Sequence, residues 1–427
     1  MKDILQQSTL QLKPNWKMIL LAMVGVGLLA FIAGVSTGNA ERAWEALLLN
    51  TLFWGGIAQA GVMLGVIWQI TDAKWGRPFK RVAEGFAAFL PAALVMFLLI
   101  ILVGNSYLFE WVEHPMEVKK AYLNLPFFIS RNIIGFSLMY GISMFFLMAS
   151  LKPDLMLARS LVPGFGGKMG DRVMALANKL LKNGEQDPAK EAIRLEAFSR
   201  KVAPLLGVTY TIVMTMVAVD FVMSLDQEWF STLFGVYFFV GNIYTTLAMM
   251  LIVMYFVRQK PGVAEYVTIN RMHDLAKLTF AFAMLWTYMT FAHYLIIWYA
   301  NVPEETPFMV TRAWADTPWR PVFWTLLGVL FIFPYLGLMS RTVCRTPAAT
   351  AVVGTILVCG QFMSHYMMVV PSIQDRHEHP TFLMGYPEIL VTLGFAGGFF
   401  LCFMLYMSTV PILPISDKHL CKSWHGR

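Results

Sequence analysis

Residues 271–308 read RMHDLAKLTFAFAMLWTYMTFAHYLIIWYANVPEETPF and decide the fold class. From Leu278 to Ala300 the segment is apolar and, at about 1.5 Å per residue in a helix, long enough to cross the hydrocarbon core of a bilayer. Ionisable and phenolic groups recur along it. Such groups are costly in lipid, so they usually face a bundle interior or a water-filled path. The segment therefore predicts a membrane helix with functional polar groups. Those groups are His273, Asp274, Lys277, Tyr288, His293, Tyr294 and Tyr299.

Composition extends this interpretation to the whole chain of 427 residues. It is 57% hydrophobic and only 14% charged, whereas about a quarter of the residues in soluble domains are charged. Apolar runs of about twenty residues recur and predict an all-α polytopic membrane protein with ten transmembrane helices. The expected spans are 16–38, 44–71, 82–104, 125–151, 203–226, 232–257, 275–300, 319–340, 348–371 and 385–411.

Lys and Arg are distributed unevenly between these spans. The two termini and the connections on their side carry 26 of them, whereas the opposite side carries only six and Arg131 lies within a span. Positively charged loops remain in the cytoplasm, so both termini are predicted to be cytoplasmic, as an even number of spans also requires. The net charge of +7 arises in these loops and does not indicate a nucleic-acid partner.

The longest connection, 152–202, lies on the predicted cytoplasmic side. An apolar stripe from Val173 to Leu181 predicts one amphipathic helix, and Pro188 opens a second that runs to Arg200. The connection is interpreted as a surface-lying segment, with docking to a partner as the alternative.

The chain offers few ligands for a metal or cofactor of its own. Its four cysteines are widely separated, without CxxC or CxxCH, so no iron–sulfur cluster, zinc ribbon or covalent haem c is expected. The loop SIQDRHEHP, residues 372–380, lacks helical i, i+4 ligand spacing and is expected to face solvent or a partner. The N-terminus lacks a small-residue cleavage site and is not expected to be a cleavable signal.

Two histidines lie deep within predicted spans. His293 is about 27 Å into its span and His365 about 26 Å into its own, so both reach a similar level near the outer surface. They could bond a quinone carbonyl and exchange a proton, ligate a haem iron, or merely bond neighbouring amides and hydroxyls. Tyr366 and Asp226, towards the same surface, complete the quinone-interacting candidates.

A chain of polar groups from the inner to the outer side gives a second hypothesis. Carboxylates, imidazoles and phenols build proton relays in membranes, although the inner groups could equally be charges that anchor the helices at the interface. The candidates for a proton path are Glu84, His273, Asp274 and Lys277 at the inner mouth, Tyr288 at mid-depth and Asp220 towards the outside.

Two stretches resemble a known family. HDLAKLTFAFAMLWTYMTFAHYLIIWYANVPEET, residues 273–306, and SLDQEWFSTLFG, residues 224–235, resemble the NrfD-like, or polysulfide reductase membrane subunit, family. Within it they are most similar to the second such subunit of bacterial alternative complex III. The resemblance implies one membrane domain with two four-helix bundles and two peripheral spans. The bundles would be 44–226, which includes the connector 152–202, and 232–371; the peripheral spans would be 16–38 and 385–411.

The resemblance also implies a function. Such complexes of the bacterial cytoplasmic membrane oxidise quinol, for example menaquinol, and pass electrons to iron–sulfur clusters and haems c in other subunits. The expected partners are an iron–sulfur subunit, haem c subunits and a second NrfD-like subunit. This chain would contribute a proton path and a quinone-interacting surface. WGRP at Trp75 to Pro78 lacks the preceding histidine of an HxGRP-like arrangement, which counts against quinol binding. A secondary transporter and a structural membrane anchor are the alternatives.

Overall fold

The computed structural model describes residues 13–181, 187–303, 305–374 and 385–417, and these residues form helices without any strand. Ten helices in this part of the chain are long and apolar enough to cross a membrane. The prediction of an all-α polytopic membrane protein with ten spans is therefore confirmed. The chain is a multi-pass membrane protein.

Seven spans are single α-helices: α2 (Pro14–Ser36), α3 (Ala40–Ile70), α7 (Leu125–Leu161), α10 (Phe234–Arg258), α11 (Ile269–Ala300), α16 (Pro347–Gln374) and α17 (Tyr386–Thr409). The fifth joins α9 (Pro188–Phe221) to η5 (Met223–Leu225). The third comprises η1 (Lys74–Phe79), α4 (Lys80–Phe86), η2 (Ala87–Phe89), α5 (Leu90–Leu99), the π-helix η3 (Ile100–Gly104) and α6 (Asn105–Leu108). The eighth comprises α13 (Trp319–Leu327), the π-helix η6 (Gly328–Ile332) and α14 (Phe333–Met339). The helices outside the spans are η4 (Glu110–Val112), α8 (Gly167–Leu181), α12 (Thr306–Ala313) and α15 (Arg341–Arg345).

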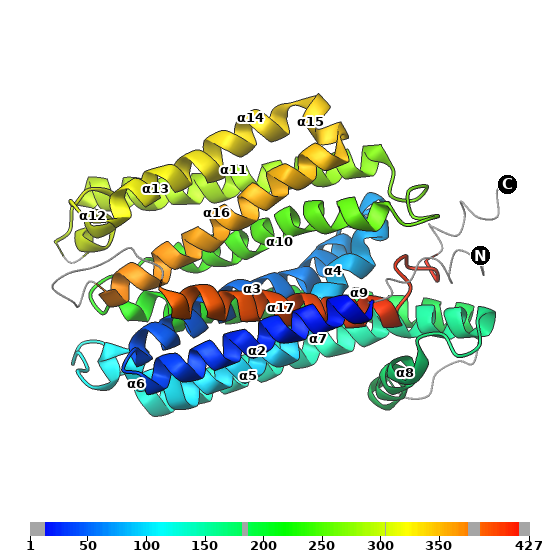
Figure 1. Cartoon of the computed structure of the whole chain (residues 1–427), viewed down its shortest axis with the longest axis horizontal. Coiled ribbons are helices and arrows are strands. Elements are labelled where there is room, and N and C mark those ends of the chain that lie inside the picture. Colours follow the sequence, from blue (N-terminus) through cyan, green and yellow to red (C-terminus); the bar gives the residue numbers. More distant parts are fainter. Residues whose placement is uncertain (1–12, 182–186, 304, 375–384, 418–427) are drawn as a thin grey trace.

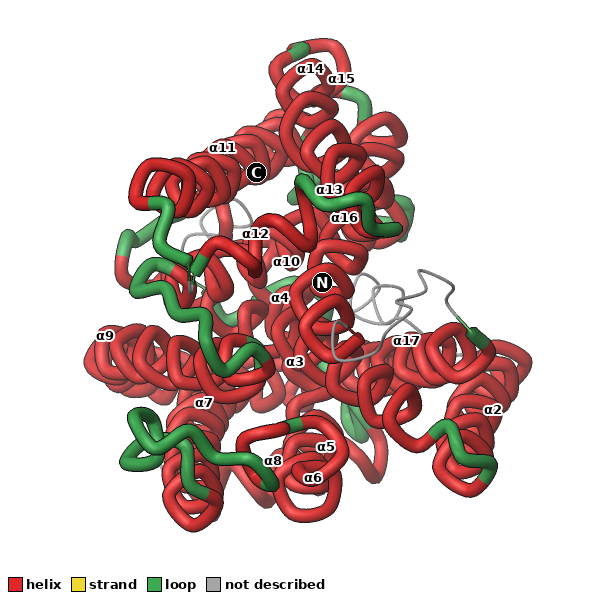
Figure 2. Tube along the Cα trace, turned by 90° about the vertical axis from the view of Figure 1, so that its left-hand side faces the viewer, coloured by secondary structure: helices red, strands yellow, loops and turns green. Residues whose placement is uncertain are grey.

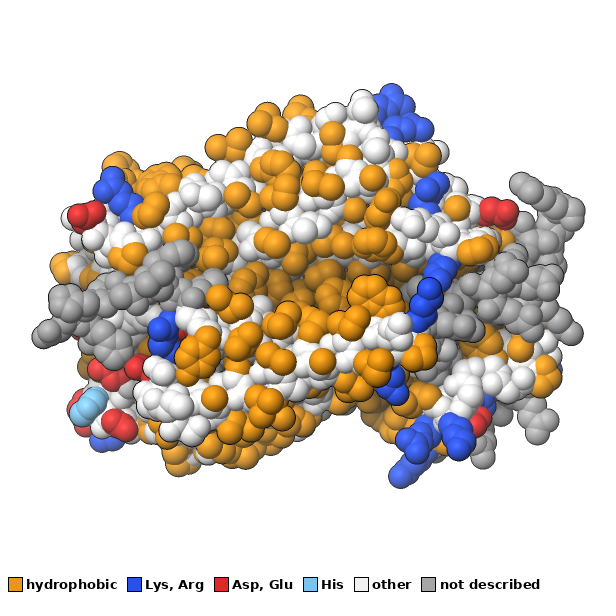
Figure 3. Space-filling view, in the orientation of Figure 1, with side chains coloured by type: hydrophobic (Ala, Val, Ile, Leu, Met, Phe, Trp, Pro, Cys, Tyr) orange, Lys and Arg blue, Asp and Glu red, His pale blue; other side chains and the backbone are white. Residues whose placement is uncertain are grey.

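The spans run side by side along the long axis (Figure 1). One end carries α8 and α15 and is called the connector end; the other carries α12 and is called the α12 end. The start of α2 and the end of α17 both lie at the connector end. Figure 3 shows hydrophobic side chains along the length of the molecule and charged ones mostly at its two ends, as a membrane-spanning protein requires.

Helix α3 lies at the centre of the assembly, where it packs against α9, α10, α16 and α17 (Figure 2). Its membrane-spanning window is buried throughout, because it faces protein rather than lipid on all sides. Helix α7 packs mainly on α9, and α10 packs mainly on α16 and α11. The two terminal spans, α2 and α17, pair closely: a Cβ added to Gly27 would lie 2.5 Å from the Cα of Gly394. Small residues allow helices in membranes to approach in this way.

The connector differs from the expectation of two short amphipathic helices. Helix α8 is separate, but the second predicted helix is the beginning of α9, which continues unbroken into the fifth span. Asp187 caps α9 by accepting a hydrogen bond from the main-chain N–H of Ala189. The ammonium of Lys152 lies 2.8 Å from the carboxylate of the buried Glu191. This ion pair joins α7 to the first turn of α9 where both helices extend beyond their apolar segments.

Candidate functional site

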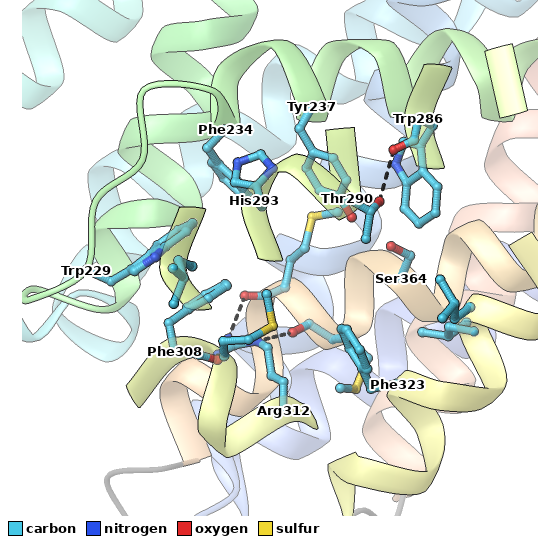
Figure 4. Close-up of a pocket in the computed structure, with 16 residues that line it drawn as sticks. Trp229, Phe234, Tyr237, Trp286, Thr290, His293, Phe308, Arg312, Phe323 and Ser364 are labelled. Carbon is cyan, nitrogen blue, oxygen red and sulfur yellow. Dashed lines mark hydrogen bonds between the residues drawn. The ribbon is translucent and has the colours of Figure 1, made fainter. Parts of the chain in front are cut away.

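A cavity of about 90 Å³ lies near the α12 end, between α10, α11, α12, α13 and α16 (Figure 4). Its wall is mainly aromatic and aliphatic, with a few polar groups, the composition that small-molecule sites usually have. The aromatic and polar residues that line it are Trp229, Phe234, Tyr237, Trp286, Thr290, His293, Phe308, Arg312, Phe323 and Ser364.

His293 supplies a hydrogen-bonding atom to this cavity. Its Nδ1 lies 2.9 Å from the carbonyl oxygen of Met289, one turn earlier on α11. Because a carbonyl oxygen only accepts, Nδ1 carries the proton, and Nε2 of the neutral ring has a free lone pair. Nε2 is buried and has no hydrogen-bond partner among the described residues. The rings of Phe234 and Tyr237 meet the imidazole edge to face, at centroid distances of 6.2 and 5.3 Å, and fix its orientation.

A row of hydroxyl groups continues from His293 along the cavity. The phenol of Tyr237 is within hydrogen-bonding reach of the hydroxyls of Ser364 and Thr290. Thr290 in turn donates a hydrogen bond of 3.0 Å to the carbonyl oxygen of Trp286. The Trp286 indole stacks on Tyr237 at 5.4 Å, and its N–H has no partner among the described residues. The cavity thus offers acceptors and donors on an otherwise apolar wall.

The end of the cavity towards α12 is closed by stacked side chains. The rings of Trp229 and Phe308 are nearly parallel, with centroids 3.7 Å apart. The guanidinium of Arg312 lies 3.7 Å from the centroid of Phe308 and donates to the carbonyl oxygen of Met367 at 2.9 Å and to the hydroxyl of Ser372 at 2.7 Å. Arg312 therefore fastens α12 to α16 and places a positive charge beside the cavity.

His365 does not share this cavity with His293. Neighbouring residues of α10 separate them, because Tyr237 contacts His293 while Phe238 contacts His365 on another face of the helix. Nδ1 of His365 lies 2.9 Å from the carbonyl oxygen of Gln361, and Nε2 lies 3.3 Å from Oδ1 of Asn242.

The Asn242 amide can donate a hydrogen bond to Nε2 of His365. Its Nδ2 has no partner among the described residues, so turning the amide lets Nδ2 donate to Nε2 of His365 and satisfies both groups. Asn242 fits in this position because residue 56 of α3 is a glycine, and a Cβ there would overlap the Asn242 side chain. His365 thus makes a buried contact with Asn242 between α16 and α10.

The other two quinone-interacting candidates lie outside the cavity. Tyr366 is buried in a cluster between α3, α13 and α16, with its ring 6.1 Å from that of Trp319. Oδ1 of Asp226 accepts hydrogen bonds of 3.2 Å from the main-chain N–H groups of Glu228 and Trp229. It lines a separate cavity of about 270 Å³ at the α12 end, of which Trp229 is also a wall. Asp226 thus holds the turn that presents Trp229 to both cavities.

Among the proton-path candidates, Asp220 is the centre of a buried network near the α12 end. Arg131 donates to both of its carboxylate oxygens at 2.8 Å, and the amide of Asn132 donates at 2.6 Å. The phenol of Tyr122, outside the spans, donates at 3.1 Å. Partial burial and the neighbouring carboxylate raise the pKa of Tyr122 to about 12, so the phenol keeps its proton at neutral pH. These partners of Asp220 lie 88 to 98 residues away along the chain, and no local sequence pattern predicts them.

Glu84 belongs to a second buried network, near the connector end. Arg81 pairs with both Glu84 and Asp154, and the hydroxyl of Ser150 donates to Glu84 at 2.6 Å. The other oxygen of Asp154 accepts from the main-chain N–H of Ser416 at 2.7 Å, which fastens the segment after α17 over this network. Asp154 and Asn132 are 22 residues apart on α7, about 33 Å by helical rise, so the two networks lie near opposite membrane surfaces.

Little polar structure joins the two networks. Midway, the amide of Gln59 on α3 donates to the hydroxyl of Ser143 on α7 at 2.9 Å. Between this pair and Asp220 the rings of Phe97, Phe136 and Phe221 pack together, with the first two centroids 4.4 Å apart. A proton path through this helix group therefore needs a rearrangement of the aromatic cluster.

The remaining proton-path candidates lie on α11. Asp274 and Lys277 form an exposed ion pair of 2.9 Å, and His273 lies beside them at the connector end. The side chain of Tyr288 is 66% exposed on the outer face of the helix bundle. The structure therefore separates the candidates into three groups, at α4, α9 and α11. Of the loop 372–380, residues 375–380 lie outside the described part of the chain. Within that part, no group of three or more His, Cys, Asp or Glu is placed to hold a metal ion.

The described residues form a helical membrane protein with an aromatic cavity near the α12 end that offers a few polar groups. The family model of polysulphide reductase, NrfD, matches residues 34–375, which is most of the chain. The protein therefore belongs to the NrfD family of membrane subunits, which typically interact with quinone and work with iron–sulfur and other redox subunits. No curated protein matches the chain.

Proposed function

We propose that this chain is a quinone-interacting membrane subunit of a quinol-oxidising complex, the bacterial alternative complex III, in the cytoplasmic membrane. The family assignment supports the quinone-related role. The resemblance of the segments around residues 224–235 and 273–306 to the second NrfD-like subunit of that complex supports the particular complex.

One observation carries the quinone assignment: Nε2 of His293 is buried without a partner among the described residues, beside an aromatic cavity. A buried polar atom without a hydrogen bond costs about 1–3 kcal/mol, and a ligand hydroxyl or carbonyl removes that cost. The flat rings of Trp229, Phe234 and Tyr237 suit an aromatic headgroup, and Arg312 favours negative charge on a ligand oxygen.

The residues suit quinol oxidation. A quinol that becomes a quinone releases two protons and two electrons. In this proposal the free lone pair at Nε2 of His293 accepts the proton of one hydroxyl as a general base, and the proton of the other hydroxyl leaves to water at the α12 end. The electrons pass to the iron–sulfur clusters and haems c that partner subunits are proposed to hold.

Proton conduction is a second proposed contribution. The networks around Glu84 and Asp220 lie near opposite membrane surfaces, and Gln59 and Ser143 lie between them. Under the positive-inside interpretation the connector end is cytoplasmic, so Glu84 receives protons and Asp220 releases them. His273, Asp274 and Lys277 lie at the cytoplasmic mouth of a separate route along α11. In this proposal spans 44–226 and 232–371 are the two functional bundles, and 16–38 and 385–411 are peripheral.

The proposed complex is tested by purification. The chain carries a C-terminal tag and is isolated in mild detergent, and the co-purifying polypeptides and haem are identified by mass spectrometry and absorption. A haem c subunit, an iron–sulfur subunit and a second NrfD-like protein are expected. Recovery of a stable chain without redox partners contradicts the proposal and favours the transporter alternative, which uptake by the chain alone then tests.

A further inference from the structure

A second hollow adjoins the aromatic cavity. It is a groove of about 510 Å³ between α11 and the eighth span. Thr290, Phe323 and Leu327 line both hollows, so these three residues form the boundary between them. The groove itself is lined by aromatic and aliphatic side chains together with Thr287 and Thr290, and it carries no charged residue.

The groove opens on the surface that faces lipid. Of the residues that line only the groove, Tyr288, Phe291 and Trp324 have exposed fractions of 66%, 57% and 47%. The two spans that form it are sparsely covered by protein, with 22% of the residues of α11 and 17% of those of the eighth span buried in their membrane-spanning windows. A hydrocarbon chain from the bilayer can therefore reach the groove without crossing water.

The wall formed by the eighth span contains a π-helix. The π-helix η6 interrupts it between α13 and α14 and carries Phe331 into the groove. A π-segment places an extra residue in a turn and is frequent at functional sites. A Cβ added to Gly328 would meet no atom within 4 Å, so the first residue of this segment has free space around it. By contrast, the stacked Trp229, Phe308 and Arg312 close the cavity at the α12 end.

We infer that the ligand is an isoprenoid quinone that reaches the cavity sideways, between α11 and the eighth span, and leaves its tail in the groove. This inference rests on the proposed quinone site. It adds the direction of access and the requirement for a tail. The chemistry fits this division, because the polar groups line the smaller cavity and the larger groove, of about 510 Å³, is apolar apart from its hydroxyl groups. An acyl chain of a phospholipid shares the tail chemistry but leaves the polar row of His293 and Tyr237 without a ligand.

Photolabelling of the purified complex distinguishes a quinone tail in the groove from an acyl chain of a phospholipid. The probe is a menaquinone analogue with a diazirine on its second isoprene unit, and the labelled residues are mapped by mass spectrometry. Label is expected on Tyr288, Phe291 or Trp324, and excess tail-less 1,4-naphthoquinone should remove it by occupying the cavity.

Three other outcomes overturn the inference in different ways. If label appears near Phe230 at the α12 end and naphthoquinone removes it, the quinone site stands but the quinone enters from the α12 end. Groove label that added phospholipid removes and naphthoquinone does not makes the groove a lipid site. If naphthoquinone competes with no label at all, the proposed quinone function fails as well.

A variant in the groove gives an independent readout. Phe291→Ala removes an aromatic contact with the tail, so the ratio of KM for long-tailed quinol to KM for tail-less quinol should rise about fivefold. The matched control is Ile296→Ala, also on the exposed face of α11 but outside the groove, which should leave the ratio unchanged. An unchanged ratio in Phe291→Ala, with the protein folded and active, contradicts a tail in the groove.

Discussion

Two regions of this molecule differ in whether their buried ionisable groups have partners. In the helix group of α4, α7 and α9, the charges meet opposite charges: Arg81 lies between Glu84 and Asp154, and Arg131 holds Asp220 with two hydrogen bonds. Around the cavity of α10, α11 and α16, Nε2 of His293 and the indole N–H of Trp286 have no partner in the described structure. The paired charges hold helices together, whereas an imidazole nitrogen without a partner beside a cavity is available to a ligand.

The largest expected effect is that of breaking a satisfied pair. Asp220→Ala leaves Arg131 as a buried charge without its carboxylate, which should lower the free energy of unfolding by about 3–5 kcal/mol. The thermal midpoint and the yield of folded protein in detergent measure this loss. Replacing both partners, Arg131→Met with Asp220→Leu, should restore much of the stability. A single variant as stable as the native chain would contradict a structural role of the pair.

A smaller loss is expected at the contact between the two regions. Gly56→Ala places a methyl group against the side chain of Asn242, and such overpacking costs about 1–3 kcal/mol. Thermal unfolding measures the change. The matched control is Gly141→Ala on α7, where a Cβ meets no atom within 4 Å, so stability should stay the same or rise. If both variants changed the stability equally, the contact between Asn242 and His365 would not depend on the close approach of α3 to α10.

Glu84→Gln separates structure from proton transfer in the first region. Glutamine keeps an acceptor for the hydroxyl of Ser150 but loses the charge that faces Arg81, so a stability loss of about 1.5–3 kcal/mol is expected. If Glu84 relays protons, the number of protons moved per electron should fall while quinol oxidation continues. Proteoliposomes with a pH-sensitive dye measure the ratio. An unchanged ratio in an assembled complex would remove Glu84 from the path.

The smallest effect is expected at the exposed pair on α11. Asp274→Asn breaks an ion pair of which both side chains are largely solvated, so stability should change by less than about 1 kcal/mol. Thermal unfolding checks this. Because the stability is retained, any decrease in proton coupling can be assigned to the route along α11. Coupling equal to that of the native complex would leave the Asp274–Lys277 pair without a role in proton transfer.

The sequence predicted the ten spans because each is a long apolar run, and it singled out Asp220, Glu84 and His293 because polar groups are rare in such runs. It did not predict their partners. Asp154 is 73 residues from Arg81, and Tyr237 resembles any other aromatic residue of a membrane helix.

The structure places His293 and His365 on different sides of α10 although their depths are similar. Helical rise gives the depth of a residue in the membrane, but not the rotation of its helix about its axis. The two histidines have similar depths, yet they face different sides of α10. The cavity beside His293 also depends on Trp229 and Phe308, which lie in loop and α12 segments whose positions no periodicity determines.

The central claim is that the cavity beside His293 binds the quinone. Titration of the purified complex with tail-less naphthoquinol tests it, with His293→Leu compared with His365→Leu. Removing Nε2 of His293 should raise Kd about tenfold, the equivalent of about 1.4 kcal/mol or one hydrogen bond, whereas His365→Leu should leave Kd within about twofold. Unchanged affinity in His293→Leu together with a large loss in His365→Leu would contradict the account and move the site to the other side of α10.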